Sequence, residues 1–144
     1  VDNYGGTRAP LQKGDVTLED LYQLMPFENR HVIVELNPDQ VKALIDYLTR
    51  QHQAHPISGI RIALDKGRAP KVWVGEKRWD PSKSYHVLTI DYLQHGGGNM
   101  TFLTQPEYLY VSDVKVRDAL IRSFRVQDTL KTGLDGRFTD SNNE

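Results

Sequence analysis

The stretch HVIVELNPDQVKALIDYLTR, residues 31–50, decides the fold because it joins a strand directly to a helix. Apolar side chains alternate with period two over His31–Leu36, which indicates a strand with one buried face. Asn37 then precedes Pro38 and Gln40, an order typical of a helix start in which two side chains cap the first turn. A single buried stripe is predicted along this helix, formed by Val41, Leu44, Ile45 and Leu48.

Towards the N-terminus, a second capped helix is predicted. Thr17 is a good N-cap, and Asp20 three residues later is an acidic variant of the capping box. This arrangement predicts a short helix over about Leu18–Leu24, which Pro26 ends. Residues 1–9 are interpreted as the end of a strand followed by a glycine turn.

Towards the C-terminus, strands dominate the pattern. Gly96–Asn99 is predicted to be a flexible loop, and Asp113 is expected to cap a final helix. No internal repeat or linker interrupts the chain, so we expect one α+β domain over residues 1–138 and a frayed tail over residues 139–144. The expected strands cover Ile60–Leu64, Lys71–Val74, Tyr85–Tyr92 and Glu107–Val111.

Composition limits the class of function. The 144 residues carry 18 basic and 19 acidic side chains, and this balance argues against binding to a nucleic-acid backbone. A chain without cysteine can form neither a disulfide framework nor a thiolate metal site. No apolar run approaches the roughly 20 residues of a membrane span. The sequence opens at Val1 without a polar leader, and we expect that residues preceded it in a longer precursor.

Motifs for catalysis are missing from the sequence. No Gly-x-Ser-x-Gly elbow surrounds Ser58, and no Gly-Lys-Ser/Thr follows the glycines at 96–98. The chain also lacks Asp-x-His, Gly-Asn-His-Glu and Gly-His-x-His, which a two-metal phosphoesterase needs. None of the histidines has a metal-ligand spacing, so we interpret all five as structural: His31, His52, His55, His86 and His95.

A few residues at the predicted ends of elements suggest a binding site. Phe27 and Tyr92 are aromatic, each is placed beside a turn or loop, and together they could enclose a flat ring. Asn3 and Arg8 bracket the glycine turn and could hold polar substituents. The alternative interpretation is that both aromatic residues simply form the rim of the core.

Seven short segments, in order, resemble the C-terminal domain of 5'-nucleotidases. The first is Asn3-Tyr4-Gly5-Gly6-Thr7-Arg8, which is similar to the family's Asn-x-Gly-Gly-Ile-Arg. The last is Asp91-Tyr92-Leu93 with Gly96-Gly97, which resembles Asp-Phe-Leu-x-x-Gly-Gly-Asp. Between them lie segments similar to the family at residues 14–17, 24–29, 34–42, 58–61 and 80–85.

The resemblance implies a layered α-β-β-α domain with mixed sheets and about three helices. It implies that the domain grips a nucleotide and presents the phosphate to a two-metal metallophosphoesterase domain, in cis or on a separate chain. It implies no catalytic, metal or cofactor site in this chain, which alone is expected to be inactive, and a periplasmic or extracellular location. The substrate-binding residues implied are Phe27 and Tyr92 on the two faces of the base, Asn29 on its edge, Gly59 close to it, and Asn3 and Arg8 at the polar end.

The sequence departs from the family at one ligand-binding position. Gly98 stands where the family has the aspartate that accepts hydrogen bonds from ribose hydroxyls, and Asn99 is at best a neutral substitute. Arginines that the family carries before its first motif would precede Val1. Three hypotheses follow: a nucleotide-binding domain of a hydrolase, a degenerate module for another ligand or a protein partner, and a free-standing hydrolase that uses residues without a motif.

Overall fold

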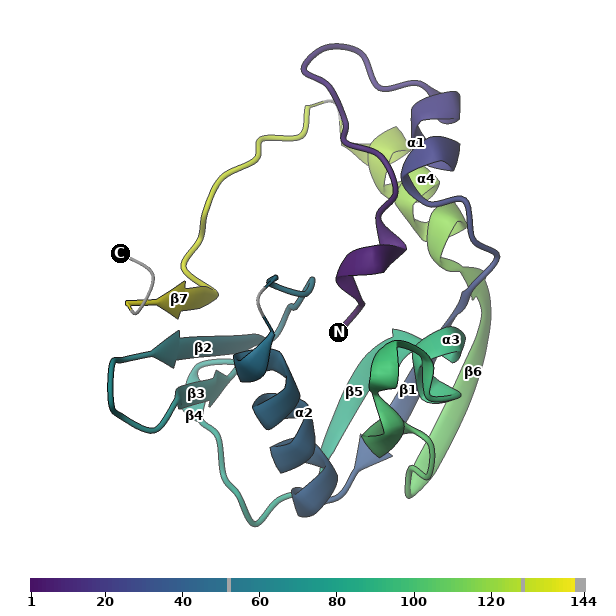
Figure 1. Cartoon of the computed structure of the whole chain (residues 1–144). Helices are drawn as coiled ribbons and strands as arrows, with labels where there is room; N and C mark the ends of the chain where they lie inside the picture. The colour runs from purple at the N-terminus through teal and green to yellow at the C-terminus, as the bar shows by residue number, and fades with distance from the viewer. Residues whose placement is uncertain (52, 128, 142–144) are drawn as a thin grey trace.

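Two β-sheets and four α-helices make up the described part of the protein (Figure 1). The structure is a computed structural model that describes residues 1–51, 53–127 and 129–141. Its helices are α1 (Leu18–Leu24), α2 (Pro38–Arg50), α3 (Asp91–Gln94) and α4 (Val116–Val126), with 3₁₀ turns at Tyr4–Gly6, Gly97–Asn99 and Thr101–Leu103. The strands are β1 (Arg30–Leu36), β2 (Ile60–Leu64), β3 (Lys71–Val74), β4 (Lys77–Arg78), β5 (Tyr85–Ile90), β6 (Tyr108–Lys115) and β7 (Phe138–Asp140). The predicted α+β class is confirmed.

The first sheet has the order β5-β1-β6 and is antiparallel throughout. Its central strand β1 pairs His31 with Ile90 of β5 and Val32 with Val111 of β6. The second sheet has the order β4-β3-β2-β7, and it is mixed because β7 runs parallel to β2. The strand of the segment 31–50, β1, is therefore the central strand of the first sheet.

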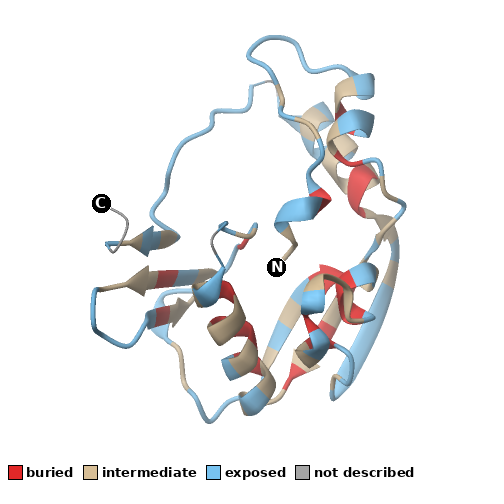
Figure 2. Cartoon of the chain, in the orientation of Figure 1, coloured by how far each residue is buried: buried red, intermediate tan, exposed pale blue. Residues whose placement is uncertain are grey.

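One hydrophobic core joins α2 to strands of both sheets. The capping box at the start of α2 forms as predicted, since Asn37 Oδ1 accepts from Gln40 N and Gln40 Oε1 accepts from Asn37 N, both at 3.0 Å. This start fixes the phase of the helix, so its apolar stripe is buried (Figure 2). The core includes Val32, Val34 and Leu36 of β1, Val41, Leu44, Ile45 and Leu48 of α2, Ile62 of β2 and Val72 of β3.

Two strand predictions are corrected, one for residues 1–9 and one for the end of β5. Residues 1–9 contain no strand, because the chain forms a 3₁₀ turn closed by Gly6 N donating to Asn3 O at 3.0 Å. The strand predicted over Tyr85–Tyr92 ends at Ile90. The short helix α3 begins at Asp91, after the extended N-cap residue Ile90, and Asp91 Oδ1 accepts from Tyr92 N at 2.8 Å. Tyr92 therefore projects from a helical turn.

Two C-terminal predictions are also corrected. β6 continues to Lys115, so Asp113 lies within the strand and does not cap α4. Its Oδ1 lies 3.6 Å from Arg30 Nη1. The predicted frayed tail is wrong for Thr139 and Asp140, which pair with β2 in β7. Residues 142–144 of that tail lie outside the described residues. No helix in the described ranges is long and apolar enough to cross a membrane.

Candidate functional site

A cavity of about 330 Å³ lies where the N-terminal turn, the segment before β1 and helix α3 meet. Ligand sites of proteins typically occupy roughly 300–1,000 Å³, so the cavity has the size for a nucleoside or a similar small molecule. The structure brings together five of the six residues predicted to bind the ligand. The lining consists of Asn3, Gly5, Gly6, Arg8, Phe27, Asn29 and Tyr92.

Gly59 is the predicted residue that the structure does not bring to this pocket. It precedes β2 in the other sheet and lines a separate hollow with Arg61 and Glu76. Its φ of 74° lies in the left-handed region, and its carbonyl accepts from Gly75 N at 2.8 Å. The geometry therefore places Gly59 at the start of β2, where its carbonyl is hydrogen-bonded to the turn after β3.

The N-terminal turn supplies the polar side of the pocket. Arg8 N donates to Leu24 O at 2.9 Å and ties this turn to the end of α1. A Cβ at Gly6 would come within 3.1 Å of Asn3 Oδ1, so glycine leaves room for that side chain. Asn3 Oδ1 is buried and has no hydrogen-bond partner among the described residues. A buried acceptor without a partner is unfavourable, and a ligand donor would satisfy it.

The guanidinium of Arg8 lies beside Phe27, with 5.3 Å between Arg8 Cζ and the ring centroid. Phe27 is half-buried and packs against the core cluster, so part of its side chain stays accessible. Within the described ranges no carboxylate pairs with Arg8. The pocket therefore combines an aromatic surface with a cation that no acidic side chain neutralises.

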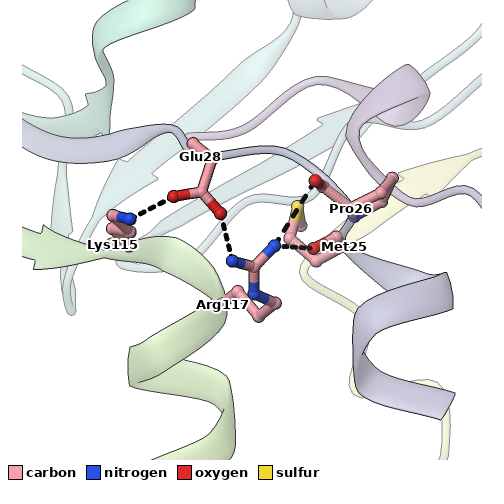
Figure 3. A network of polar contacts seen from close by, with 5 residues as sticks. All are labelled: Met25, Pro26, Glu28, Lys115 and Arg117. Atoms are coloured by element: carbon pink, nitrogen blue, oxygen red, sulfur yellow. Dashed lines mark hydrogen bonds and ion pairs between the residues drawn. The ribbon is translucent and has the colours of Figure 1, made fainter. Parts of the chain in front are cut away.

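A charged network joins the segment that carries Phe27 to Lys115 and Arg117 (Figure 3). Glu28 accepts hydrogen bonds from Lys115 Nζ and Arg117 Nη2, and Arg117 Nη1 also donates to the carbonyl of Pro26 at 3.3 Å. These two cations lower the pKa of the Glu28 carboxyl below its usual 4.5. Arg117 itself is buried, whereas Glu28 is exposed.

Side chains alternate along this segment. Phe27 and Asn29 line the pocket, and Glu28 between them joins the network on the other side. The backbone is fixed as well, because Val116 N donates to Asn29 O at 2.9 Å. The start of α4 therefore positions both pocket residues, although α4 contributes none of the lining.

Tyr92 of α3 also lines the pocket, and the glycine loop after α3 packs against it from outside the lining. A Cβ at Gly97 would come within 2.5 Å of two ring atoms and the carbonyl oxygen of Tyr92, so this position must be glycine if the ring is to keep its place. Gly98 has φ 62° and ψ 19°, and Tyr47 Oη donates to its carbonyl at 2.7 Å. Tyr92 itself is 50% exposed, which leaves its ring accessible to a ligand.

Sequence reasoning missed four residues that support the pocket. Gly97 lies against the lining residue Tyr92. The other three, His55, Tyr47 and Arg117, form hydrogen bonds to the backbone of Tyr4, Gly98 and Pro26, which lie outside the lining. Only Gly97 gave a signal, because it belongs to the segment that resembles the family's glycine loop. The other three depend on contacts between segments that are 51 or more residues apart.

The histidines do not gather into a metal centre within the described part of the chain. No group of three or more histidine and acidic side chains that could hold a metal ion occurs in residues 1–51, 53–127 and 129–141. His86 lies 3.8 Å from Glu35, and His95 Nδ1 lies 2.7 Å from the carbonyl of Asp91. His52 lies outside the described residues.

Comparison with known proteins places the fold. The solved structures that it resembles include a 5'-nucleotidase precursor from Thermus thermophilus, with a TM-score of 0.81 at 22% identity, covering 97% of this chain and 31% of that one. The NAD nucleotidase of Haemophilus influenzae superposes with a TM-score of 0.76 at 20% identity, over 96% of this chain and 29% of that one. At these identities the likeness shows a shared fold.

Sequence comparison points to the same family. Protein UshA of Salmonella pullorum is 28% identical over an alignment 100 positions long, which covers 65% of this chain and 18% of that protein. The apyrase of Tabanus yao is 22% identical over an alignment 156 positions long, which covers 94% of this chain and 28% of that protein. The chain thus spans less than a third of each relative. The family model described as "5'-nucleotidase, C-terminal domain" matches residues 1–105, and the chain belongs to that family.

Proposed function

We propose that this chain is the nucleotide-binding part of a 5'-nucleotidase-type phosphate-ester hydrolase. The observation that supports it best is the convergence of Asn3, Arg8, Phe27, Asn29 and Tyr92 on one cavity of about 330 Å³. These residues come from three separate segments, and the sequence resemblance singled them out independently of any geometry. A pocket with two aromatic residues, an unpaired cation and amide groups suits a flat base that carries a polar, anionic end.

Each side chain has a chemical role in this proposal. Phe27 and Tyr92 stack on the base, and such stacking is worth about 1–3 kcal/mol per base in nucleic-acid systems. Asn29 forms hydrogen bonds with the base edge, where its amide offers both a donor and an acceptor. Asn3 Oδ1 accepts from the ligand, which removes its unsatisfied state. Arg8 pairs with phosphate.

The chemical step is assigned to another domain. Two-metal hydrolysis requires clusters of histidine and carboxylate ligands, and the described residues provide no such group. The metal ions and the attacking water therefore belong, in this proposal, to a metallophosphoesterase domain in cis or on a separate chain. The family resemblance also favours nucleotide catabolism in the periplasm or outside the cell, where such an enzyme would meet its substrate.

A second candidate rests on Gly98. The family's ribose-binding aspartate is replaced there, so a module that binds another flat ligand or a protein partner is the competing function. The backbone at Gly98 would accept an aspartate, since Asp tolerates left-handed angles and a Cβ would meet the end of the Leu93 side chain at 3.3 Å. Gly98→Asp is expected to increase affinity for adenosine but not for 2′,3′-dideoxyadenosine. Equal affinities before and after the change would favour the competing module.

Calorimetric titration of the chain with adenosine and with AMP tests the main proposal. Tyr92→Leu should weaken both ligands by about fivefold or more, because one stacking face is lost. Tyr110→Leu is the matched control, since Tyr110 is also 50% exposed but lies on β6. Arg8→Gln should weaken AMP by about tenfold and leave adenosine nearly unchanged. Equal effects of Tyr92→Leu and Tyr110→Leu would overturn the assignment.

A further inference from the structure

Two side chains outside the lining connect the N-terminal turn to the glycine loop beside Tyr92. Tyr4 N donates to His55 Nδ1 at 3.2 Å, which attaches the N-terminal turn to the loop before β2. Tyr47 Oη donates to Gly98 O at 2.7 Å, which attaches the glycine loop to α2. The rings of Tyr47 and His55 lie against each other with 5.4 Å between their centroids. A continuous chain of contacts therefore runs from Asn3 and Tyr4 to the loop that supports Tyr92.

We propose that His55 and Tyr47 are positioning residues of the pocket, and that protonation of His55 releases the N-terminal turn and weakens ligand binding. The proposal rests on the nucleotide-binding function proposed above. Neither side chain lines the cavity, so both act through Asn3 on one side and Tyr92 on the other.

The hydrogen bond from Tyr4 defines which form of His55 is active. Nδ1 accepts from a backbone N–H, so it must carry a lone pair, and the proton of neutral His55 must be on Nε2. The protonated imidazolium has two N–H donors and no acceptor, so it cannot hold Tyr4. The loss of one such hydrogen bond corresponds to an affinity change of about two- to tenfold.

The charge state of His55 can change near neutral pH. Burial lowers the pKa of His55 from its usual 6.5, which keeps the acceptor form present at neutral pH. The contact is thus complete above about 6.5 and is lost as the pH falls through the lowered pKa. The groups that face this site are the Asp2 carboxylate, the Val1 amine, the Tyr47 hydroxyl, His31 by way of Asp2, and Asp135 and Arg137 across the neighbouring hollow.

Asp2 is the neighbour whose charge matters most. Its own pKa is raised by burial, and a hydrogen bond to the Asp2 backbone together with the Asp2 charge opposes the decrease in the pKa of His55. Asp2 N also donates to Pro56 O at 3.0 Å, so the segment keeps one neutral anchor after His55 is protonated. The expected response is therefore a shift of the Asn3–Tyr4 turn, with the chain still folded.

Nuclear magnetic resonance of the whole chain tests the proposal without ligand. Between about pH 8 and about pH 5, the Asn3 side-chain amide and the Tyr92 ring should shift with the same midpoint as the His55 ring. In His55→Asn both should lose this midpoint, because an amide oxygen can accept from Tyr4 N but does not titrate in this range. His86→Asn is the matched control and should keep it. Titration of His55 without any shift at Asn3 or Tyr92 would overturn the proposal.

Adenosine affinity over the same range gives the second readout. Adenosine is the suitable probe because it lacks a phosphate, whose second pKa of about 6 would confuse the profile. Affinity should fall about two- to tenfold with decreasing pH in the wild type and stay constant in His55→Asn. Equal falls in both would overturn the proposal. Absence of adenosine binding at every pH, with the coupled shifts intact, would refute the nucleotide-binding function while leaving the positioning roles standing.

Discussion

Phe27 and Tyr92 face the same pocket, but their supports differ in chemistry. The segment around Phe27 is held by ions: Arg117 and Lys115 both pair with Glu28, and Arg117 also binds backbone carbonyls. The loop beside Tyr92 is held by a neutral hydrogen bond from the Tyr47 hydroxyl to Gly98 O. It can pack closely against Tyr92 because Gly97 has no side chain. The position of Phe27 therefore depends on ion pairs to the start of α4, and the position of Tyr92 depends on close packing against Gly97.

This difference indicates how binding and stability are distributed. The ionic network ties residues 25–28 to residues 115–117, so changes there should affect folding first and the ligand second. The contacts that support Tyr92 are a single neutral hydrogen bond and close packing at Gly97, so changes there should affect the ligand more than the fold. Variants on the two sides should therefore separate these effects.

Arg117→Met should have the largest effect. It removes the donors to Glu28 and to the carbonyls of Met25 and Pro26, and it also loses the stacking of Arg117 on Tyr22 at 4.2 Å. We expect the free energy of unfolding to fall by roughly 2–3 kcal/mol, measured by urea denaturation. Arg122→Met on the same helix is the control and should change it by less than about 0.5 kcal/mol. Similar losses in both variants would contradict the anchoring role.

Gly97→Ala should have the next largest effect, and on binding. The new methyl group would overlap the Tyr92 ring and its carbonyl oxygen, so the ring must leave its present position in the pocket. We expect adenosine affinity to fall by about tenfold and unfolding free energy by about 1–2 kcal/mol. Gly133→Ala is the matched control, since no atom lies within 4 Å of its Cβ position. Unchanged affinity in Gly97→Ala would show that the Tyr92 ring does not need its present place.

Tyr47→Phe should produce a smaller change on the same side. The substitution leaves Gly98 O without its donor but keeps the ring against His55. Loss of one hydrogen bond predicts a decrease in adenosine affinity of about two- to tenfold, with little loss of stability. Calorimetry measures the first and denaturation the second. A large loss of stability with unchanged affinity would place Tyr47 in the core and outside the support of the pocket.

The pH dependence of the Phe27 side should be the smallest effect and should appear only in acid. The pKa of Glu28 is lowered from 4.5, so its ion pairs contribute stability above that value and lose it as the pH falls through the lowered pKa. Glu28→Gln should therefore differ from the wild type at neutral pH and converge with it in acid, measured by urea midpoints. A difference that persists at the lowest pH would contradict this origin.

Local sequence signals were sufficient for the parts of the fold that depend on neighbours in the chain. The caps at Thr17 and Asn37 formed as predicted because their partners lie three residues away. β7 was missed because Phe138–Asp140 pairs with β2 across the chain and has no alternating pattern of its own. Tyr92 was assigned to a strand because the apolar alternation continues past Ile90, while the backbone turns into the helix α3 at Asp91.

The pocket shows the same division. Asn3, Arg8, Phe27, Asn29 and Tyr92 were named from a resemblance, which encodes the three-dimensional site of a family in short motifs, and their convergence is now seen in the geometry. Gly59 was named in the same way, yet it lies in the second sheet. Arg117 and His55 could not be predicted, because each acts through a partner 51 or more residues distant.

The most direct measurement of the central claim is a titration of the chain with adenosine, followed through the aromatic side-chain resonances of Phe27 and Tyr92, with Tyr110 as the internal reference. If the two rings enclose the base, both should shift strongly at millimolar adenosine with a single dissociation constant, while Tyr110, on β6, should stay constant. Unmoved resonances of Phe27 and Tyr92 at that concentration would contradict the claim.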